Sequence, residues 1–216
     1  MSLPHPTYTP IPKAGDDSAL FKVAIADLRP TQWSVGFAEI WARQIDFAQE
    51  TEQQHLRYLR RKPVPVVKDG TGNLWMLDRH HRLRALLEQN PGASTWAYLV
   101  DDRSTSSSAD VLAFLQEQGW LYLIDGRGKG PHAAQDLPGS LMGLDDDPYR
   151  SLVWKLKKEG LITPQPQIPY HEFRWGAWLR RRPLPPFSSR ALEPALPPAR
   201  RLVCSSNAAE MPGWRG

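Results

Sequence analysis

The side chains best suited to chemistry lie close together in residues 74–90, which read LWMLDRHHRLRALLEQN. An apolar run typical of a strand ends at Asp78, and two Arg and two His follow before leucines resume at helical spacing. Asp is a preferred N-cap residue, so we expect a helix to begin near Asp78. The first backbone N–H groups of a helix have no partner within it, and the helix dipole favours an anion there.

This pattern predicts a phosphate site at the start of the helix, with a guanidinium suited to phosphate oxygens. A helix N-terminus disfavours imidazolium, so a His there stays neutral and able to accept a proton. The phosphate-binding candidates are Arg79, His80, His81 and Arg82, and the catalytic candidates are Asp78, His80 and His81. The structural alternative is that Asp78 only caps the helix and that the two His, about 100° apart around its axis, are one half-buried and one surface residue.

Composition narrows the class of protein. The chain has 216 residues, 41% hydrophobic and 23% charged, which is typical of a globular protein. A single cysteine, Cys204, excludes an internal disulfide framework and a multi-cysteine zinc site. No apolar run reaches the ~18–20 residues of a membrane helix, and the N-terminus has no secretory signal pattern. We therefore expect a cytoplasmic protein with no membrane partner.

The net charge of +4 is divided between the body of the chain and its C-terminal end. Residues 183–216 hold four Arg and two Glu, so the rest of the chain is nearly balanced. A dedicated duplex-DNA binder usually carries a stronger basic stripe, so nucleic acid is a partner that the charge does not favour.

Hydrophobic periodicity predicts a mixed α/β or α+β domain. A hairpin is expected where PVPVVKD and LWML flank the turn DGTGN, whose glycines supply positive φ. Other expected strands are residues 22–28, TWAYLVDD and WLYLID. One long helix or two shorter helices are expected within residues 37–59. Further helices are expected around residues 83–89 and 111–115, from Pro148 onward, and over residues 170–182.

Four regions are expected along the chain. Residues 1–20 form a flexible N-terminal arm, residues 21–130 the core, and residues 131–182 a helical extension packed on that core. Tyr149, Val153, Trp175 and Trp178 of this extension are expected on the same core as Leu83 and Leu87. Residues 183–216 contain seven prolines and are predicted to be a disordered tail.

The string PVPVVKDGTGNLWMLDRHHRLRALLE resembles the core of the ParB/sulfiredoxin superfamily, in which a strand–turn–strand leads into a helix carrying a Gly-x-x-Arg-type phosphate box. With DLRPTQWSVG, LPGSLMGLDDDPYRSLVWKL and YHEFRWGAWLRRR in this order, residues 22–182 resemble the bacterial ParB-like nuclease group. The resemblance implies a ParB/sulfiredoxin-like core with a C-terminal helical extension.

The superfamily's branches imply different chemistries. Sulfiredoxins have a reactive Cys where this chain has His80, so their chemistry is not supported. Segregation ParB proteins bind CTP through Gly-Glu-Arg-Arg, but Arg79 and His80 replace the Gly and the Glu here. A free-serine kinase branch, which transfers phosphate from a nucleotide and tolerates His in the box, is closest in residue chemistry. The implied cofactors are a nucleotide, ATP/ADP or CTP, and Mg²⁺.

Several other residues are candidates for the same pocket. Gln32 follows the first strand, where superfamily members place nucleotide contacts, and Arg150, His171 and Glu172 recur in the blocks of the resembling group. Asp145, Asp146 and Asp147 could bind Mg²⁺ together with nucleotide phosphates. The alternative is that Gln32 is an ordinary loop residue and that the aspartates form a solvated helix start.

Three hypotheses about function follow. The first is an enzyme that binds a nucleotide or a phosphorylated small molecule and transfers or hydrolyses its phosphate. The second is a nuclease that uses the same site on nucleic acid, and the third is a non-catalytic nucleotide-binding module. The substrate, the metal and the oligomeric state do not follow from the sequence.

Overall fold

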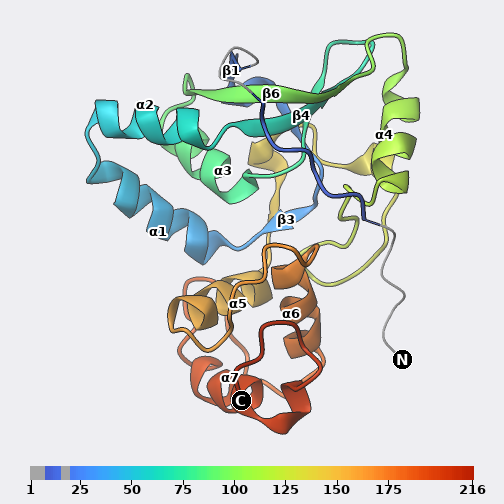
Figure 1. Cartoon of the computed structure of the whole chain (residues 1–216). Coiled ribbons are helices and arrows are strands. Elements are labelled where there is room, and N and C mark those ends of the chain that lie inside the picture. The colour runs from blue at the N-terminus through green and yellow to red at the C-terminus, as the bar shows by residue number, and fades with distance from the viewer. Residues whose placement is uncertain (1–7, 16–19) are drawn as a thin grey trace.

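The computed structural model describes residues 8–15 and 20–216. Its centre is a curled five-stranded mixed sheet in the order β1-β6-β4-β5-β2 (Figure 1). Strand β1 pairs with β6 and β5 pairs with β4 in antiparallel orientation. The pairs β4–β6 and β5–β2 are parallel. The strands are β1 (Phe21–Ala24), β2 (Leu28–Pro30), β4 (Val64–Lys68), β5 (Leu74–Met76) and β6 (Ser94–Asp102).

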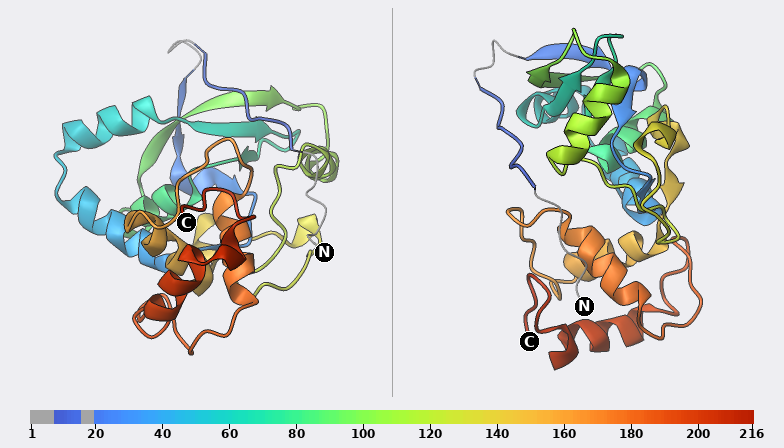
Figure 2. Two further views of the ribbon diagram at one scale, coloured as in Figure 1. Left: turned by 60° about the horizontal axis from the view of Figure 1, so that its bottom comes forward. Right: turned by 90° about the vertical axis from the view of Figure 1, so that its right-hand side faces the viewer.

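Helices lie on both faces of this sheet (Figures 1 and 2). Adjacent residues of β4 point to opposite faces, as the alternation of a strand requires, so that Val66 joins one hydrophobic cluster and Val67 another. The helices of this N-terminal lobe, which comprises residues 20–146, are α1 (Phe37–Ala48), α2 (Glu52–Arg61), α3 (His80–Gln89) and α4 (Ser108–Glu117).

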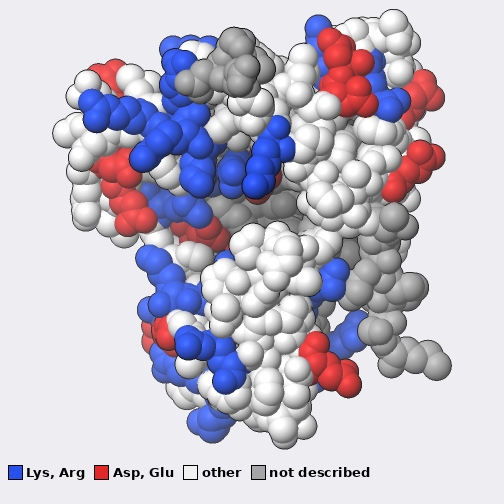
Figure 3. All heavy atoms as spheres, viewed as in Figure 1, with Lys and Arg blue, Asp and Glu red and all other residues white. Residues whose placement is uncertain are grey.

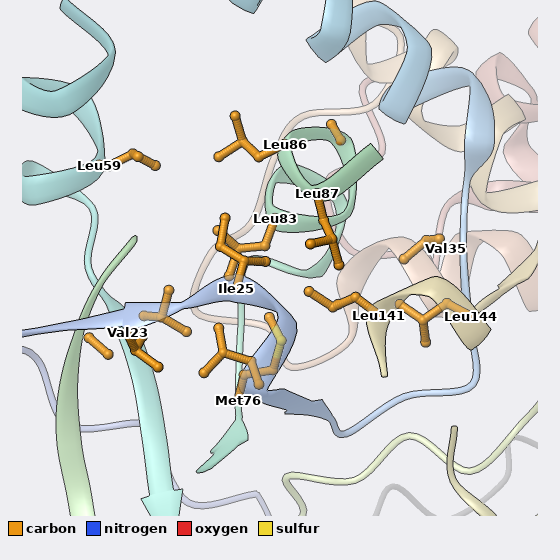
Figure 4. Packing of buried hydrophobic residues seen from close by; sticks show 14 of the residues in the cluster. Val23, Ile25, Val35, Leu59, Met76, Leu83, Leu86, Leu87, Leu141 and Leu144 are labelled. Atoms are coloured by element: carbon orange, nitrogen blue, oxygen red, sulfur yellow. The ribbon is translucent and has the colours of Figure 1, made fainter. Parts of the chain in front are cut away.

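The larger cluster lies between the sheet and α3, where leucines recur at helical spacing. Leu83, Leu86 and Leu87 meet Ile25 and Met76 there (Figure 4). Leu141 and Leu144 close the same cluster from a later loop, so residues up to about 146 belong to this lobe. On the opposite face, α4 packs its own apolar residues on the sheet.

The hairpin predicted between β4 and β5 is confirmed, and a buried carboxylate organises its turn. Asp69 is fully buried and accepts hydrogen bonds from the backbone N–H groups of Thr71 and Asn73, from Trp75 Nε1 and from Ser108 Oγ. Burial alone would raise the pKa of Asp69, but these donors favour the ionised form and hold the pKa well below its usual range.

Some expected elements differ in detail. The strand expected over residues 22–28 is split into β1 and β2 by a 3-10 turn, Ile25–Asp27, and the long amphipathic segment forms two helices, α1 and α2. The strand predicted for WLYLID is wrong: within the described chain, residues 120–125 form only an isolated bridge between Tyr122 and Gln32. No helix of the described residues is long and apolar enough to cross a membrane.

Residues 147–216 form a C-terminal lobe with a separate hydrophobic cluster (Figures 1 and 2). Its helices are α5 (Pro148–Lys158), α6 (His171–Arg180) and α7 (Leu196–Cys204). Val153 and Trp175 pack in this cluster and not with Leu83, so the expectation that the extension shares one core is wrong. The lobe meets the sheet lobe mainly through α1, which packs against both α3 and α5.

The prediction of a disordered tail for residues 183–216 is also wrong. Leu192, Leu196, Ala199 and Val203 are buried against α5 and α6, because α7 presents one apolar stripe to them. Its prolines do not break α7: Pro197 and Pro198 lie in the first turn, where a missing N–H costs no helical hydrogen bond.

The N-terminal arm also has an ordered portion. Residues 1–7 and 16–19 of the predicted arm lie outside the described residues, but residues 8–15 are attached to the sheet lobe. Thr9 donates its N–H to the Gln118 carbonyl, and its own carbonyl accepts from Trp120 Nε1. Tyr98 adds a hydrogen bond from its hydroxyl to the Pro12 carbonyl.

The packing of α7 predicts a stability cost for a single truncation in the tail. Leu196 is 2% exposed, and Leu196→Ala should lower the free energy of unfolding by about 2–5 kcal/mol, the cost of a cavity in a packed core. Leu56→Ala, at a position 48% exposed on α2, is the matched control and should change it by about 0.5 kcal/mol or less. Urea denaturation measures both; equal effects would mean that α7 is not packed.

Candidate functional site

A cavity of about 410 Å³ lies between the two lobes. Its walls come from the first turn of α3 and from α1 in the sheet lobe, and from α5, the following loop and α6 in the C-terminal lobe. Five basic and three acidic side chains line it: Arg43, Arg79, Arg82, Arg150 and Lys157, and Glu39, Asp78 and Glu172. The wall is thus rich in charge, with cations in excess.

The start of α3 differs from the prediction. The helix begins at His80, and Arg79 occupies the N-cap position with φ 80° and ψ 14°, a left-handed conformation. Asp78 does not cap the helix: its Oδ1 accepts the Arg79 N–H at 2.6 Å, and its Oδ2 lies 2.9 Å from Arg79 Nη1. Left-handed backbone favours Gly, so Arg79 holds a conformation that residues with a side chain adopt less readily.

Both histidines use Nε2 as a hydrogen-bond acceptor. His80 Nε2 accepts the backbone N–H of Thr31 at 3.2 Å, and His81 Nε2 accepts that of Gly36 at 2.9 Å. A neutral ring that accepts at Nε2 carries its proton on Nδ1. Neither Nε2 is therefore free, in this arrangement, to take a proton from a bound substrate.

Burial and neighbouring cations keep the two rings uncharged. Burial, followed by the charges of His81 and Arg150, lowers the pKa of His80 to about 3. Burial also lowers the pKa of His81, although Glu39 works in the opposite direction. Each neutral ring can therefore keep its hydrogen bond, through which His80 connects α3 to the loop after β2 and His81 connects α3 to the start of α1.

Helix α1 contributes two pocket residues that the sequence did not reveal. Glu39 is 6% exposed; its Oε1 accepts from Arg43 Nε at 3.0 Å, and its Oε2 lies 3.7 Å from His81 Nε2. Glu39 and Arg43 are four residues apart, a spacing common on solvent-exposed helices, so the pattern gave no sign of burial. Their place in the cavity wall follows from the packing of α1 against α5 and α3.

The C-terminal lobe contributes a partly buried ionic cluster. Arg150 Nη2 donates to Glu172 Oε2 at 3.2 Å, and Lys157, also absent from the sequence-based candidates, donates to Glu172 Oε1. Burial alone would raise the pKa of Glu172, but Arg150 and Lys157 outweigh it and lower that pKa to about 2. Glu172 is therefore firmly ionised and is not a proton donor near neutral pH.

Arg150 has hydrogen-bonding capacity that the protein does not use. Its side chain is 5% exposed, and its guanidinium carbon lies 3.6 Å from the centroid of the Phe173 ring. Its buried Nε and Nη1 have no hydrogen-bond partner among the described residues. A buried unpartnered donor on a charged group is costly, so this guanidinium is suited to an anion in the cavity.

The remaining candidates fall into two groups. Gln32 and His171 line the cavity, but Gln32 Nε2 donates to the Ser34 carbonyl and His171 Nε2 to that of Pro212. Asp146 is not in the cavity wall and accepts instead the N–H of Phe37 and the hydroxyl of Ser189.

The last aspartate of the run has a structural role. Asp147 caps α5 and pairs with Arg180, and the described residues contain no group of three His, Cys, Asp or Glu placed to hold a metal ion.

Fold and site together define a mixed α+β protein with a cation-lined cavity at a helix N-terminus, between a sheet lobe and a helical lobe. The chain belongs to the family described as "Putative ParB-like nuclease", whose sequence profile matches residues 21–181. The predicted ParB-like resemblance and α+β class are thereby confirmed.

A solved structure supports the same fold over almost the whole chain. The crystal structure of protein Atu1540 from Agrobacterium tumefaciens is similar, with a TM-score of 0.78 and 29% sequence identity. The match covers 91% of this chain and 98% of that one. No curated protein matches the chain significantly.

The buried histidine predicts an acid-sensitive fold. Because the folded pKa of His80, about 3, lies below the ordinary value near 6.5, the unfolded chain takes up the proton first as pH falls. Stability should therefore be lost as pH drops below about 6.5, by up to about 1.4 kcal/mol per pH unit from this residue.

His80→Gln, whose amide oxygen can still accept the Thr31 N–H, should remove this contribution. Urea denaturation between pH 4.5 and 8 measures it. Above pH 7, where His80 is neutral in the folded and unfolded states, the free energy of unfolding should change with pH similarly in wild type and variant. Below pH 6.5 it should change less steeply with pH in the variant. Identical slopes throughout would show that His80 is not held neutral.

Proposed function

We propose that the cavity between the lobes binds the phosphate of a nucleotide or a phosphorylated small molecule, and that phosphate-ester transfer or hydrolysis takes place there. The observation that carries the proposal is Arg150, a residue of the cavity wall whose buried guanidinium has two nitrogens without a hydrogen-bond partner among the described residues. A phosphate oxygen is a strong acceptor for such a group and would offset the cost of burying it.

Two further features support an anion at this place. The first N–H groups of α3 precede the first hydrogen bond of the helix, from Leu83 N–H to the Arg79 carbonyl, and residues 78–82 all line the cavity. Arg82, 7% exposed, donates Nη1 to the Lys62 carbonyl and keeps its buried Nε without a partner among the described residues. Arginines from both lobes thus line one cavity.

Phosphoryl transfer depends mainly on positioning and on stabilising negative charge, and the cavity is built for both. In this scheme Arg150, Arg82 and the α3 amides bind the phosphate, while neutral His81 positions α1 and its Glu39. Asp78, whose side chain is 53% exposed, is the carboxylate available to Mg²⁺ or to an attacking water. A nuclease that uses the same site is the second candidate, because the family is described as a ParB-like nuclease.

A thermal-shift panel tests the binding proposal. The ligands are ATP, ADP, CTP, GTP and phosphate, each with and without Mg²⁺, against single- and double-stranded oligonucleotides. A ligand that binds only the folded state adds about 2.7 kcal/mol at a hundredfold excess over its dissociation constant, or roughly 5–10 °C for a chain of this size. We expect such a shift from at least one phosphate-bearing ligand.

Arg150→Lys is the sharpest variant because it keeps the charge that faces Glu172 but removes the planar fork. It should reduce the ligand-induced shift by at least half, and Arg82→Ala should act similarly. Arg127→Gln, on an exposed loop outside the cavity, is the control. If no phosphate-bearing ligand shifts the melt at millimolar concentration, the proposal fails.

Catalysis has its own test. With the ligand that binds best, Asp78→Asn should preserve most of the melting shift and lower the rate of phosphate or nucleotide release at least tenfold. An unchanged rate would contradict the role assigned to Asp78, and no turnover by the wild type would leave a binding module.

A further inference from the structure

A basic surface outside the cavity begins on α2. Arg57, Arg61 and Lys62 are exposed there, and none of them forms an ion pair within the described part of the chain. In Figure 3, Lys and Arg side chains gather over α2 and toward the region between the two lobes. We call Arg57, Arg61 and Lys62 the α2 cations.

Helix stability accounts for only part of this charge. Basic residues in the last turn of a helix interact favourably with its dipole, which suits Arg61. Arg57 lies a full turn earlier, where the dipole gives little benefit. The same helix borders a surface hollow of about 510 Å³ whose wall includes Arg57, Tyr58 and Arg61.

The α2 cations are physically joined to the cavity by Arg82. The Arg82 guanidinium carbon lies 4.4 Å from the Tyr58 ring centroid, and its Nη1 donates to the Lys62 carbonyl at 3.1 Å. Arg82 also lines the cavity between the lobes. One side chain therefore contacts the end of α2 on one side and the candidate phosphate site on the other.

We propose that the α2 cations bind the phosphates next to the one held in the cavity, so that the ligand is a single-stranded phosphodiester chain. This inference rests on the proposed function and names its substrate class. Residues four apart on a helix are separated by about 6 Å along the axis, so Arg57 and Arg61 can meet successive phosphates of an extended strand. A cavity of 410 Å³ suits one small molecule and does not admit a paired duplex.

Fluorescence anisotropy with a labelled oligothymidylate of twelve nucleotides tests the proposal. Competition by ATP reports on the cavity alone. The triple variant Arg57→Gln, Arg61→Gln, Lys62→Gln should weaken oligonucleotide binding at least tenfold at 50 mM salt. It should also reduce the slope of log K against log salt by about 2, from three contacts of roughly 0.7 each. The ATP-induced melting shift should not change.

The matched control removes the same charge elsewhere. Arg127→Gln, Lys129→Gln, Arg201→Gln, at exposed positions on a loop and on α7, should leave oligonucleotide affinity within about twofold of the wild type. Equal losses from both triple variants would mean unspecific attraction and would overturn the proposal.

Three other outcomes are decisive. ATP binding without oligonucleotide binding would overturn the α2 surface while sparing the proposed function, whereas no binding of either would overturn both. Equal competition by a polyglutamate peptide would show that the α2 cations accept any acidic chain, which also contradicts a phosphodiester ligand.

Discussion

The arrangement of the two lobes depends on the hydrogen bonds that the backbone N–H groups at the start of α1 make. Three successive N–H groups with no helical partner, those of Gly36, Phe37 and Ala38, donate to His81 Nε2, Asp146 Oδ1 and Ser151 Oγ. His81 on α3 and Asp146, the last residue of the sheet lobe, supply two acceptors, and Ser151 on α5 of the C-terminal lobe supplies the third. Each buried N–H left unpaired would cost about 1–3 kcal/mol, so the junction specifies one arrangement of the lobes.

Close packing at this junction reinforces the same constraint. A Cβ on Gly36 would lie 2.7 Å from the Ser151 backbone nitrogen, so only glycine lets α1 approach α5 this closely. Ser151 Oγ also contacts Ser189 Oγ, which donates to Asp146, and this connects the tail to the junction. Asp147 then caps α5, and the first turn of that helix carries Arg150 to the cavity.

The cavity breaks the usual rule that buried charges are fully paired. Glu172 is shared by Arg150 and Lys157, so one carboxylate faces two cations, and two Arg150 nitrogens remain without partners among the described residues. A protein gains nothing in stability from such an incomplete pairing. Departures of this kind concentrate at functional sites, where a ligand completes the charge balance.

The sequence by itself determined the features that depend on local pattern. Turn glycines and flanking apolar runs specified the β4–β5 hairpin, leucine spacing specified α3, and Pro148 marked the start of α5. The resemblance of four ordered blocks was sufficient for the family. Gln32, Arg150, His171 and Glu172 were found in this way, and all line the cavity.

Tertiary structure decided what each polar group does, because burial and hydrogen-bond partners come from distant segments. Asp78 looked like a cap, but the left-handed turn at Arg79 moved the start of α3 past it. Glu39 and Arg43 have the spacing of a surface ion pair, and they form part of the cavity wall because α1 packs against α5. The tail looked disordered because seven prolines interrupt it and few apolar residues remain, yet α7 folds since the apolar face of α5 and α6 supplies the burial that its own sequence lacks.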